Sequence, residues 1–75
     1  MGKRGGLIRN RIRDLREAAG GITQQELADA IGITRQTVNA IEANKYSPSL
    51  EVAFEIALVF KAPLEKVFQY GDVEQ

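Results

Sequence analysis

The chain has 75 residues, which is enough for one small domain and too few for a second. It contains no cysteine and no histidine, so disulfides, thiolate metal sites and the commonest general base are all excluded. The formal net charge is zero, but residues 1–16 hold six basic side chains against one acidic one, whereas residues 50–75 are acidic.

The first predicted helix covers residues 9–19. Ile8, Ile12 and Leu15 recur at helical spacing along it, which predicts one buried face. The pair Gly20-Gly21 then ends the helix, because glycine tolerates the left-handed backbone of a helix stop.

The second and third predicted helices are joined by a short turn. Thr23 and Glu26 have the spacing of a capping box, which predicts a helix from there to about residue 31. Gly32 suits the turn, and Thr34 can cap a third helix over residues 35–43. The inner faces are expected to carry Leu27, Ala28 and Ile31 in the second helix, Ile33 in the turn, and Val38 and Ile41 in the third helix.

Two further helices complete the prediction. Residues 44–48 form a loop, and Ser49 caps a fourth helix that runs to about residue 60. Pro63 is suited to be the first residue of a short fifth helix ending near residue 68. The expected fold is all-α, a compact five-helix domain spanning residues 1–75.

Two helices joined by a turn of about four residues containing glycine are typical of a helix-turn-helix, here residues 23–44. Side chains near the start of its second helix can reach base edges in the major groove. Arg35 can bond guanine, Gln36 can bond adenine, and Asn39 lies one turn later on the same face. The alternative is that these three side chains form an ordinary solvated face. The start of the second helix would approach a phosphate, with Gln24 best placed to assist.

The string TQQELADAIGITRQTVNAIEANKYSPSLEVAFEIA resembles the phage repressor and Cro-type helix-turn-helix family, often called XRE. The matching elements, taken jointly, are specific. They are Thr23-Gln24 with Leu27-Ala28, Gly32-Ile33-Thr34, Arg35-Gln36-Thr37, Ile41-Glu42 and Pro48-Ser49-Leu50. The resemblance covers residues 12–68 and implies a transcriptional regulator that binds double-stranded DNA.

The resemblance also implies roles for individual residues. Those facing the major groove would be Arg35, Gln36 and Asn39. Those contacting the DNA backbone would be Gln24, Thr34, Thr37, Asn44 and Lys45, and we add the adjacent Tyr46 to this set. The family pairs an arginine of the first helix with the glutamate of the third, here Arg16 and Glu42. Gly20-Gly21 departs from the family's single glycine, which puts the register of Arg16 in question. The shortest family members also form a two-stranded sheet from their two ends, here residues 6–9 and 68–72.

The fourth predicted helix carries more apolar side chains than one buried stripe requires. We predict that Leu50, Ala53 and Ala57 face the core and that Val52, Phe54, Val59 and Phe60 form a homodimer interface. The alternative is that the fifth helix and the tail cover this surplus. A dimer would present two reading helices to a palindromic or near-palindromic operator.

The leading hypothesis is a sequence-specific regulator, expected to repress by occluding a promoter. The alternative is a protein-interaction module or an antitoxin that uses the same fold. We expect that the protein is not an enzyme and that it binds no cofactor, metal or small-molecule ligand. No signal peptide is recognisable, and the longest apolar run, residues 52–60, is too short to cross a bilayer. We therefore expect a cytoplasmic protein without membrane contact.

Overall fold

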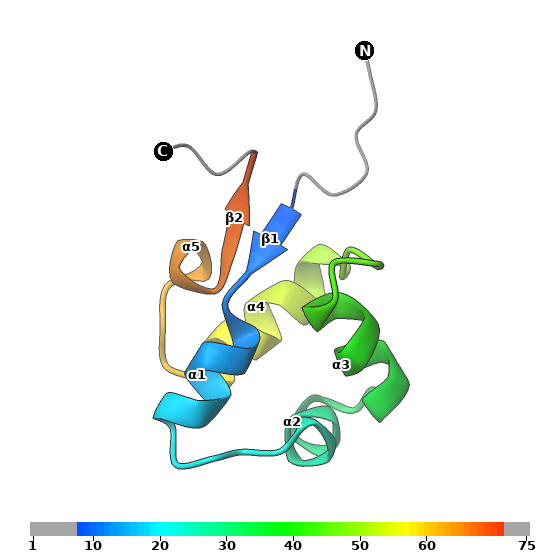
Figure 1. Cartoon of the computed structure of the whole chain (residues 1–75), viewed down its shortest axis with the longest axis vertical. Helices are drawn as coiled ribbons and strands as arrows, with labels where there is room; N and C mark the ends of the chain where they lie inside the picture. Colours follow the sequence, from blue (N-terminus) through cyan, green and yellow to red (C-terminus); the bar gives the residue numbers. More distant parts are fainter. Residues whose placement is uncertain (1–7, 72–75) are drawn as a thin grey trace.

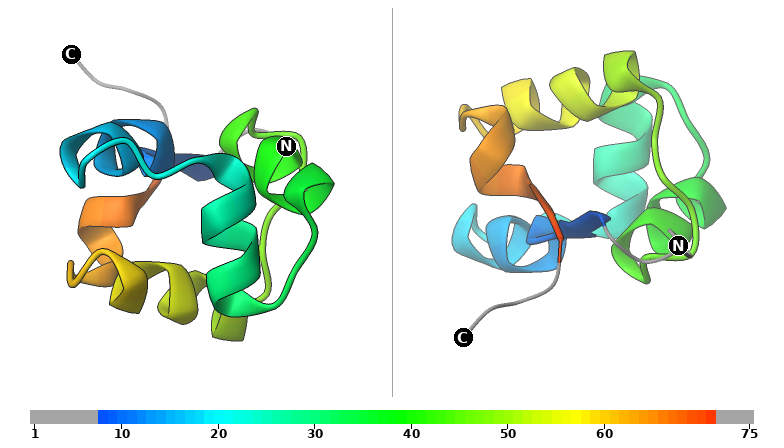
Figure 2. Two further views of the ribbon diagram at one scale, coloured as in Figure 1. Left: turned by 90° about the horizontal axis from the view of Figure 1, so that it is seen from below. Right: turned by 90° about the horizontal axis from the view of Figure 1, so that it is seen from above.

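The computed structural model describes residues 8–71 (Figure 1). In chain order the elements are β1 (Ile8–Asn10), α1 (Ile12–Ala18), α2 (Gln24–Ile31), α3 (Arg35–Glu42), α4 (Leu50–Val59), α5 (Leu64–Val67) and β2 (Phe68–Tyr70). Five helices and a small two-stranded antiparallel sheet confirm the predicted fold class. In both views of Figure 2, α3 lies at one side of the molecule and α5 at the other.

Side-chain caps set the starts of the three longest helices. At α2 both halves of the capping box form. The Thr23 hydroxyl accepts from the Glu26 amide at 3.0 Å, and the Thr23 amide donates to Glu26 Oε1 at 2.9 Å. Thr34 accepts from the Thr37 amide at 3.1 Å, and Ser49 accepts from the Val52 amide at 3.2 Å. These local bonds confirm the three predicted helix starts.

The two ends of the described chain pair as the sheet, and this pairing shortens α1. Ile8 pairs with Tyr70 and Asn10 with Phe68, so β1 ends one residue later than predicted. The predicted start of α1 at residue 9 is wrong, because residues 8–10 satisfy their backbone in the sheet instead. The predicted strand residues 6, 7 and 72 lie outside the described residues. In α5, Pro63 is the cap rather than the first helical residue, and Phe68 belongs to β2.

The hydrophobic core draws at least one side chain from every helix. Its buried members are Ile12, Leu27, Ala28, Val38, Ile41, Ile56, Ala57 and Val67. Leu15, Ile31 and Ile33 pack against this cluster while partly buried, as their spacing predicts. Within residues 8–71 no polar or charged residue is fully buried. The core therefore gains its stability from apolar burial, and the polar network described below lies at its edge.

The orientation of α4 matches the prediction only in part, since Ala53 and Ala57 are buried as predicted but other residues are not placed as expected. Its buried side is centred on Ile56, and Val52 and Val59, which were placed on the outer face, pack against the core. Leu50, which was assigned to the core stripe, is 67% exposed. The reason is that α4 contacts α2 and also α5, so a wider arc is buried than one stripe, and this arc is rotated away from Leu50. No helix among the described residues is long and apolar enough to span a membrane.

Candidate nucleic-acid interface

The three predicted base-reading residues lie together on the outer face of α3. Arg35, Gln36 and Asn39 are all exposed, and Val38 and Ile41 on the opposite face are buried in the core. A shallow hollow lined by Gln36, Asn39, Ala40, Ala43 and Lys45 continues this face toward the end of the helix. The structure thus brings the early residues of α3 and the loop that follows it onto one surface.

The predicted backbone-contacting residues are placed at the two ends of this surface. Thr34 is exposed at the start of α3, and its hydroxyl lies 2.9 Å from that of Thr37, so the two hydroxyls share one hydrogen bond. Asn44, Lys45 and Tyr46 follow the end of α3, and all three are exposed. Asn44 adopts a left-handed backbone with φ of 61°, which turns the chain away from the helix.

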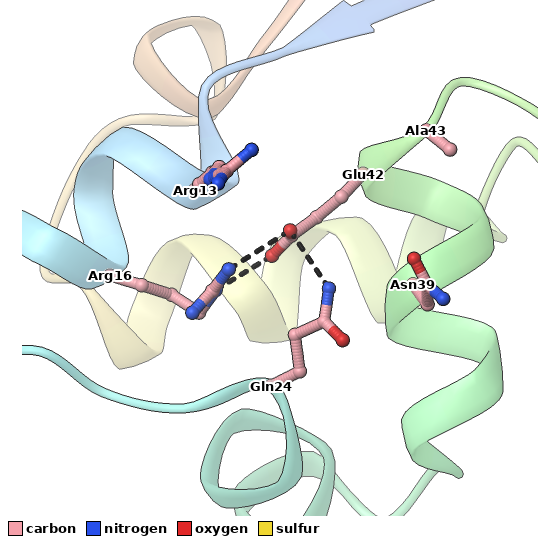
Figure 3. A pocket seen from close by; sticks show the side chains of 6 residues that line it. All are labelled: Arg13, Arg16, Gln24, Asn39, Glu42 and Ala43. Atoms are coloured by element: carbon pink, nitrogen blue, oxygen red, sulfur yellow. Dashed lines mark hydrogen bonds and ion pairs between the residues drawn. The ribbon is translucent and has the colours of Figure 1, made fainter.

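Gln24 occupies a different position from the other predicted contacts. It is the first residue of α2 and is only half exposed. Its side-chain Nε2 donates to Glu42 Oε1 at 3.0 Å, which ties the start of α2 to the last turn of α3 (Figure 3). In this geometry the Gln24 side chain helps to hold the third helix in place.

Arg16 and Glu42 form a two-bond ion pair, as predicted. Arg16 Nε donates to Glu42 Oε2 at 2.7 Å and Nη2 donates to Oε1 at 3.0 Å. Both side chains are largely buried, with 14% and 9% of their surfaces exposed. The hydrogen bonds to Glu42 raise the pKa of Arg16 above its ordinary value, and the neighbouring carboxylates add to this while burial opposes it.

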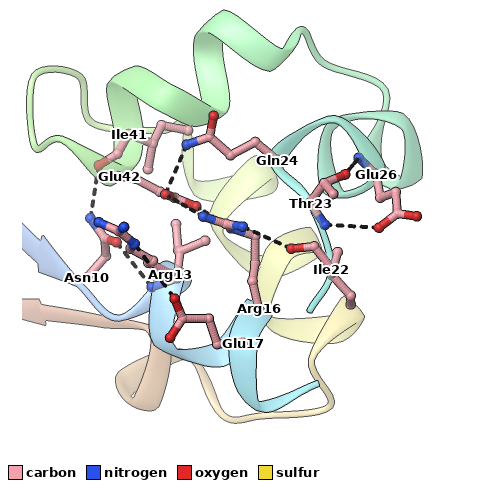
Figure 4. A network of polar contacts seen from close by, with 11 residues as sticks. Asn10, Arg13, Arg16, Glu17, Ile22, Thr23, Gln24, Glu26, Ile41 and Glu42 are labelled. Carbon is pink, nitrogen blue, oxygen red and sulfur yellow. Dashed lines mark hydrogen bonds and ion pairs between the residues drawn. The ribbon is translucent and has the colours of Figure 1, made fainter. Parts of the chain in front are cut away.

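The doubled glycine accommodates this ion pair. Gly20 and Gly21 both have positive φ, 100° and 89°, so the chain folds back onto α1 and the amides of Gly21 and Ile22 donate to the Arg16 carbonyl. The Arg16 guanidinium then donates from Nη1 to the Ile22 carbonyl at 2.9 Å. Arg16 therefore pairs with Glu42 although the turn carries two glycines. We call Arg16, Gln24, Glu42 and the Ile22 carbonyl the Glu42 network (Figure 4).

Two residues that the sequence reasoning did not select also reach this surface. Arg13 lies one helical turn before Arg16 and lines, with Arg16, Gln24, Asn39, Glu42 and Ala43, a pocket of about 350 Å³ (Figure 3). Its spacing of three residues from Arg16 could have indicated this position, since residues three apart share one face of a helix. Asn10 hydrogen-bonds to α3 and to Asn44, and no local pattern indicated this because its partners lie more than 30 residues away.

Among the described residues, no cluster of histidine, cysteine, aspartate or glutamate could hold a metal ion. Apart from the Glu42 carboxylate, which is paired with Arg16, the polar groups of this surface are amides, hydroxyls, guanidinium groups and one ammonium group. Most of these are hydrogen-bond donors, and they suit an anionic, acceptor-rich partner.

Comparisons with known proteins agree with this arrangement. Residues 12–67 match the helix-turn-helix family model. The chain is 46% identical over 67 residues to an uncharacterized HTH-type transcriptional regulator of Archaeoglobus fulgidus, covering 89% of this chain and 94% of that protein. It is 43% identical to an uncharacterized HTH-type transcriptional regulator of Methanocaldococcus jannaschii, covering 89% of this chain and 100% of that protein.

A solved structure from Bacteroides fragilis, described as a candidate DNA-binding protein, shares the fold. It has a TM-score of 0.73 at 24% identity, over 84% of this chain and 100% of that chain. The family match covers all five helices and both halves of the motif. The chain is therefore a member of the XRE-type helix-turn-helix family of transcriptional regulators.

Proposed function

We propose that this protein binds double-stranded DNA sequence-specifically as a homodimer on a palindromic operator, and represses transcription by occluding a promoter. The observation that carries the proposal is the exposed row of Arg35, Gln36 and Asn39 on a helix that the Glu42 network bonds to α1 and α2. Base reading requires side chains that are free at their tips and fixed at their backbone. The two requirements are met together on α3.

The chemistry of the row suits base edges. Arg35 can donate two bonds to guanine O6 and N7, and Gln36 can both donate to and accept from adenine. Asn39 lies one turn further along, where it can read a neighbouring base or contact the sugar-phosphate chain. A solvated face would explain the exposure of these residues, but it would not require the Arg16–Glu42–Gln24 bonds that fix the helix beneath them.

Electrostatics support binding by placed contacts rather than by overall charge, because the net charge is zero. On this surface Arg13, Arg35 and Lys45 are exposed, and the carboxylate of Glu42 is already paired with Arg16. We therefore expect these cations, together with the amides at the start of α2, to contact phosphates on either side of the groove.

The homodimer is supported by apolar surface on α4, although by different residues from those first predicted. Leu50, Phe54 and Leu58, which we call the α4 stripe, are 67%, 50% and 75% exposed and follow one another at every fourth residue. Of the four predicted interface residues only Phe54 belongs to this stripe, because Val52, Val59 and Phe60 pack against the core. A two-fold contact through the α4 stripe would give two α3 helices, which read half-sites about 34 Å apart.

Selection of bound duplexes from a random library tests the proposal directly. We expect enrichment of an inverted repeat with half-sites about one helical turn apart. Arg35→Ala should relax base preference at one position of each half-site, whereas Lys45→Ala should weaken all sequences about equally and reduce the salt dependence. Lys66→Ala is the matched control, because Lys66 lies on α5 at the opposite side of the molecule from α3. Failure to enrich any duplex would contradict the proposal and favour a protein-interaction module.

A further inference from the structure

Asn10, the last residue of β1, uses its side chain to join three parts of the chain. Its Oδ1 accepts from the Ile12 amide at 3.1 Å, which closes a tight turn before α1. Its Nδ2 donates to the Ile41 carbonyl at 2.9 Å and to Asn44 Oδ1 at 3.0 Å (Figure 4 shows the first of these). One carboxamide thus connects the terminal sheet and α1 with the end of α3.

The direction of these hydrogen bonds is set by the backbone. The Ile12 amide can only donate, so Asn10 must present its oxygen to Ile12 and its NH₂ group to α3. The atom of Asn44 that meets this NH₂ must then be the acceptor Oδ1. Asn44 is exposed, and its own NH₂ group is therefore the end of its carboxamide that is left for a ligand.

The backbone of Asn44 is fixed as well. Its amide donates to the Ile41 carbonyl at 3.0 Å and the Lys45 amide donates to the Ala40 carbonyl at 2.9 Å, which together form the closing motif of α3. The Ile41 carbonyl accepts from Asn10 as well as from the end of the helix. Asn10 in turn is held by β2 and by the end of α5, because it pairs with Phe68 and the next amide, that of Arg11, donates to the Val67 carbonyl at 2.9 Å.

We infer that Asn10 is a positioning residue for DNA binding, and that it orients Asn44 so that Asn44 Nδ2 donates to a backbone phosphate at the exit of α3. This inference rests on the proposed function. Asn10 itself makes no contact with DNA. The sheet formed by the two ends of the described chain thereby contributes to the contact surface through a single side chain.

A double-mutant cycle on a duplex from the selection above tests the inference. Asn10→Ser keeps an oxygen for the Ile12 amide but has no NH₂ group for α3. Asn44→Gly removes the carboxamide and tolerates the positive φ. Each single variant is expected to weaken binding about 10-fold per half-site, the loss typical of one hydrogen bond to a charged group, and the double variant should weaken binding no more than either single variant. Because neither residue is charged, the salt dependence should stay that of the wild type, whereas Lys45→Ala reduces it.

The contact can also be located on the DNA. In duplexes that carry one neutral methylphosphonate each, one position per half-site should weaken the wild type and leave both Asn10→Ser and Asn44→Gly unaffected. Affinities are compared after correction for the folded fraction from urea unfolding.

If Asn10→Ser loses stability but its folded form binds like the wild type, Asn10 is only structural and the inference is overturned. Additive losses in the double variant overturn it too. If the wild type binds no duplex at all, the proposed function itself is refuted.

If Asn10→Ser fails to fold, Asn44→Gly together with NMR of side-chain amides keeps the inference testable. On addition of duplex to the wild type, the NH₂ signals of Asn44 should shift strongly and those of Asn10 only slightly. A strong shift of Asn10 alone would overturn the inference.

Discussion

Glu42 is the residue on which the geometry of the reading helix depends. Three side-chain donors, two from Arg16 and one from Gln24, converge on its carboxylate. Because the ion pair is largely buried, the free energy gained from the pair depends on keeping both partners, and a lone charge left there would be poorly solvated. Since burial only partly offsets the rise in its pKa, Arg16 stays protonated at every pH at which the protein would be handled.

We expect Arg16→Met to lower the free energy of unfolding by about 2–4 kcal/mol, because it leaves the Glu42 carboxylate without its main partner. Adding Glu42→Leu to this variant should recover part of the loss, since the unpaired charge is then gone. The measurement is urea unfolding at one fixed protein concentration. Arg13→Met is the control: its ion pair with Glu17 is exposed and 3.9 Å long, so it should change stability by less than about 0.5 kcal/mol. Equal losses at Arg13 and Arg16 would contradict the assignment.

Whether the role of a residue could be predicted depends on how far apart in the sequence the residue and its partners lie. The sequence predicted Arg35, Gln36 and Asn39 as an exposed face, because residues three and four apart on a helix must share a side. Arg16 with Glu42 could be proposed only through the family resemblance. The link from Asn10 to Asn44 could not be predicted, because it depends on where β1 lies against the end of α3.

At the scale of elements, helix ends divide into those with glycine and those without. α2 is capped at its C-terminal end by Gly32, with φ of 81°, and an added Cβ there would meet no atom within 4 Å. The chain leaves α4 instead through Lys61, which follows the cap residue Phe60 and has φ of 53°, and the amides of Lys61 and Ala62 donate back to the carbonyls of Leu58 and Ala57. The same closing motif is therefore made with a residue that pays a steric cost for it.

Lys61→Gly is expected to raise the free energy of unfolding by about 1 kcal/mol, because glycine removes the clash of Cβ in the left-handed region. Lys61→Ala removes the same charge but keeps Cβ, so it should give no such gain. Thermal and urea unfolding of the three proteins separate the two effects. Equal stabilisation by both substitutions would show that the charge, and not the backbone, limits stability at this helix end.

At the scale of the whole molecule, α4 keeps apolar side chains exposed to solvent even though other helices pack against it. α2 and α5 cover a broad side of it, yet the α4 stripe of Leu50, Phe54 and Leu58 stays exposed. A small domain has few residues with which to cover such a stripe, and a second copy would cover it by the same contact on both partners.

Leu58→Glu is therefore expected to convert a dimer to a monomer at micromolar concentration, because it places two like charges in a two-fold apolar contact. Sedimentation velocity measures the change, with Ala18→Glu, an exposed site on α1 outside the stripe, as the control. The monomeric variant should bind an isolated half-site normally but lose the added affinity of the inverted repeat. A Leu58→Glu protein that stays dimeric would exclude the α4 stripe as the interface.

The sequence by itself determined the helix-turn-helix from Thr23 onward, the caps at Thr23, Thr34 and Ser49, and the outward face of α3. All of these depend on contacts within one or two helical turns, and the spacing of residues encodes such contacts directly. Only the tertiary structure decided which arc of α4 is buried and where α1 begins. It also decided that Asn10 meets Asn44. These outcomes depend on how elements distant in sequence pack together, and the spacing of residues within one element does not determine that packing.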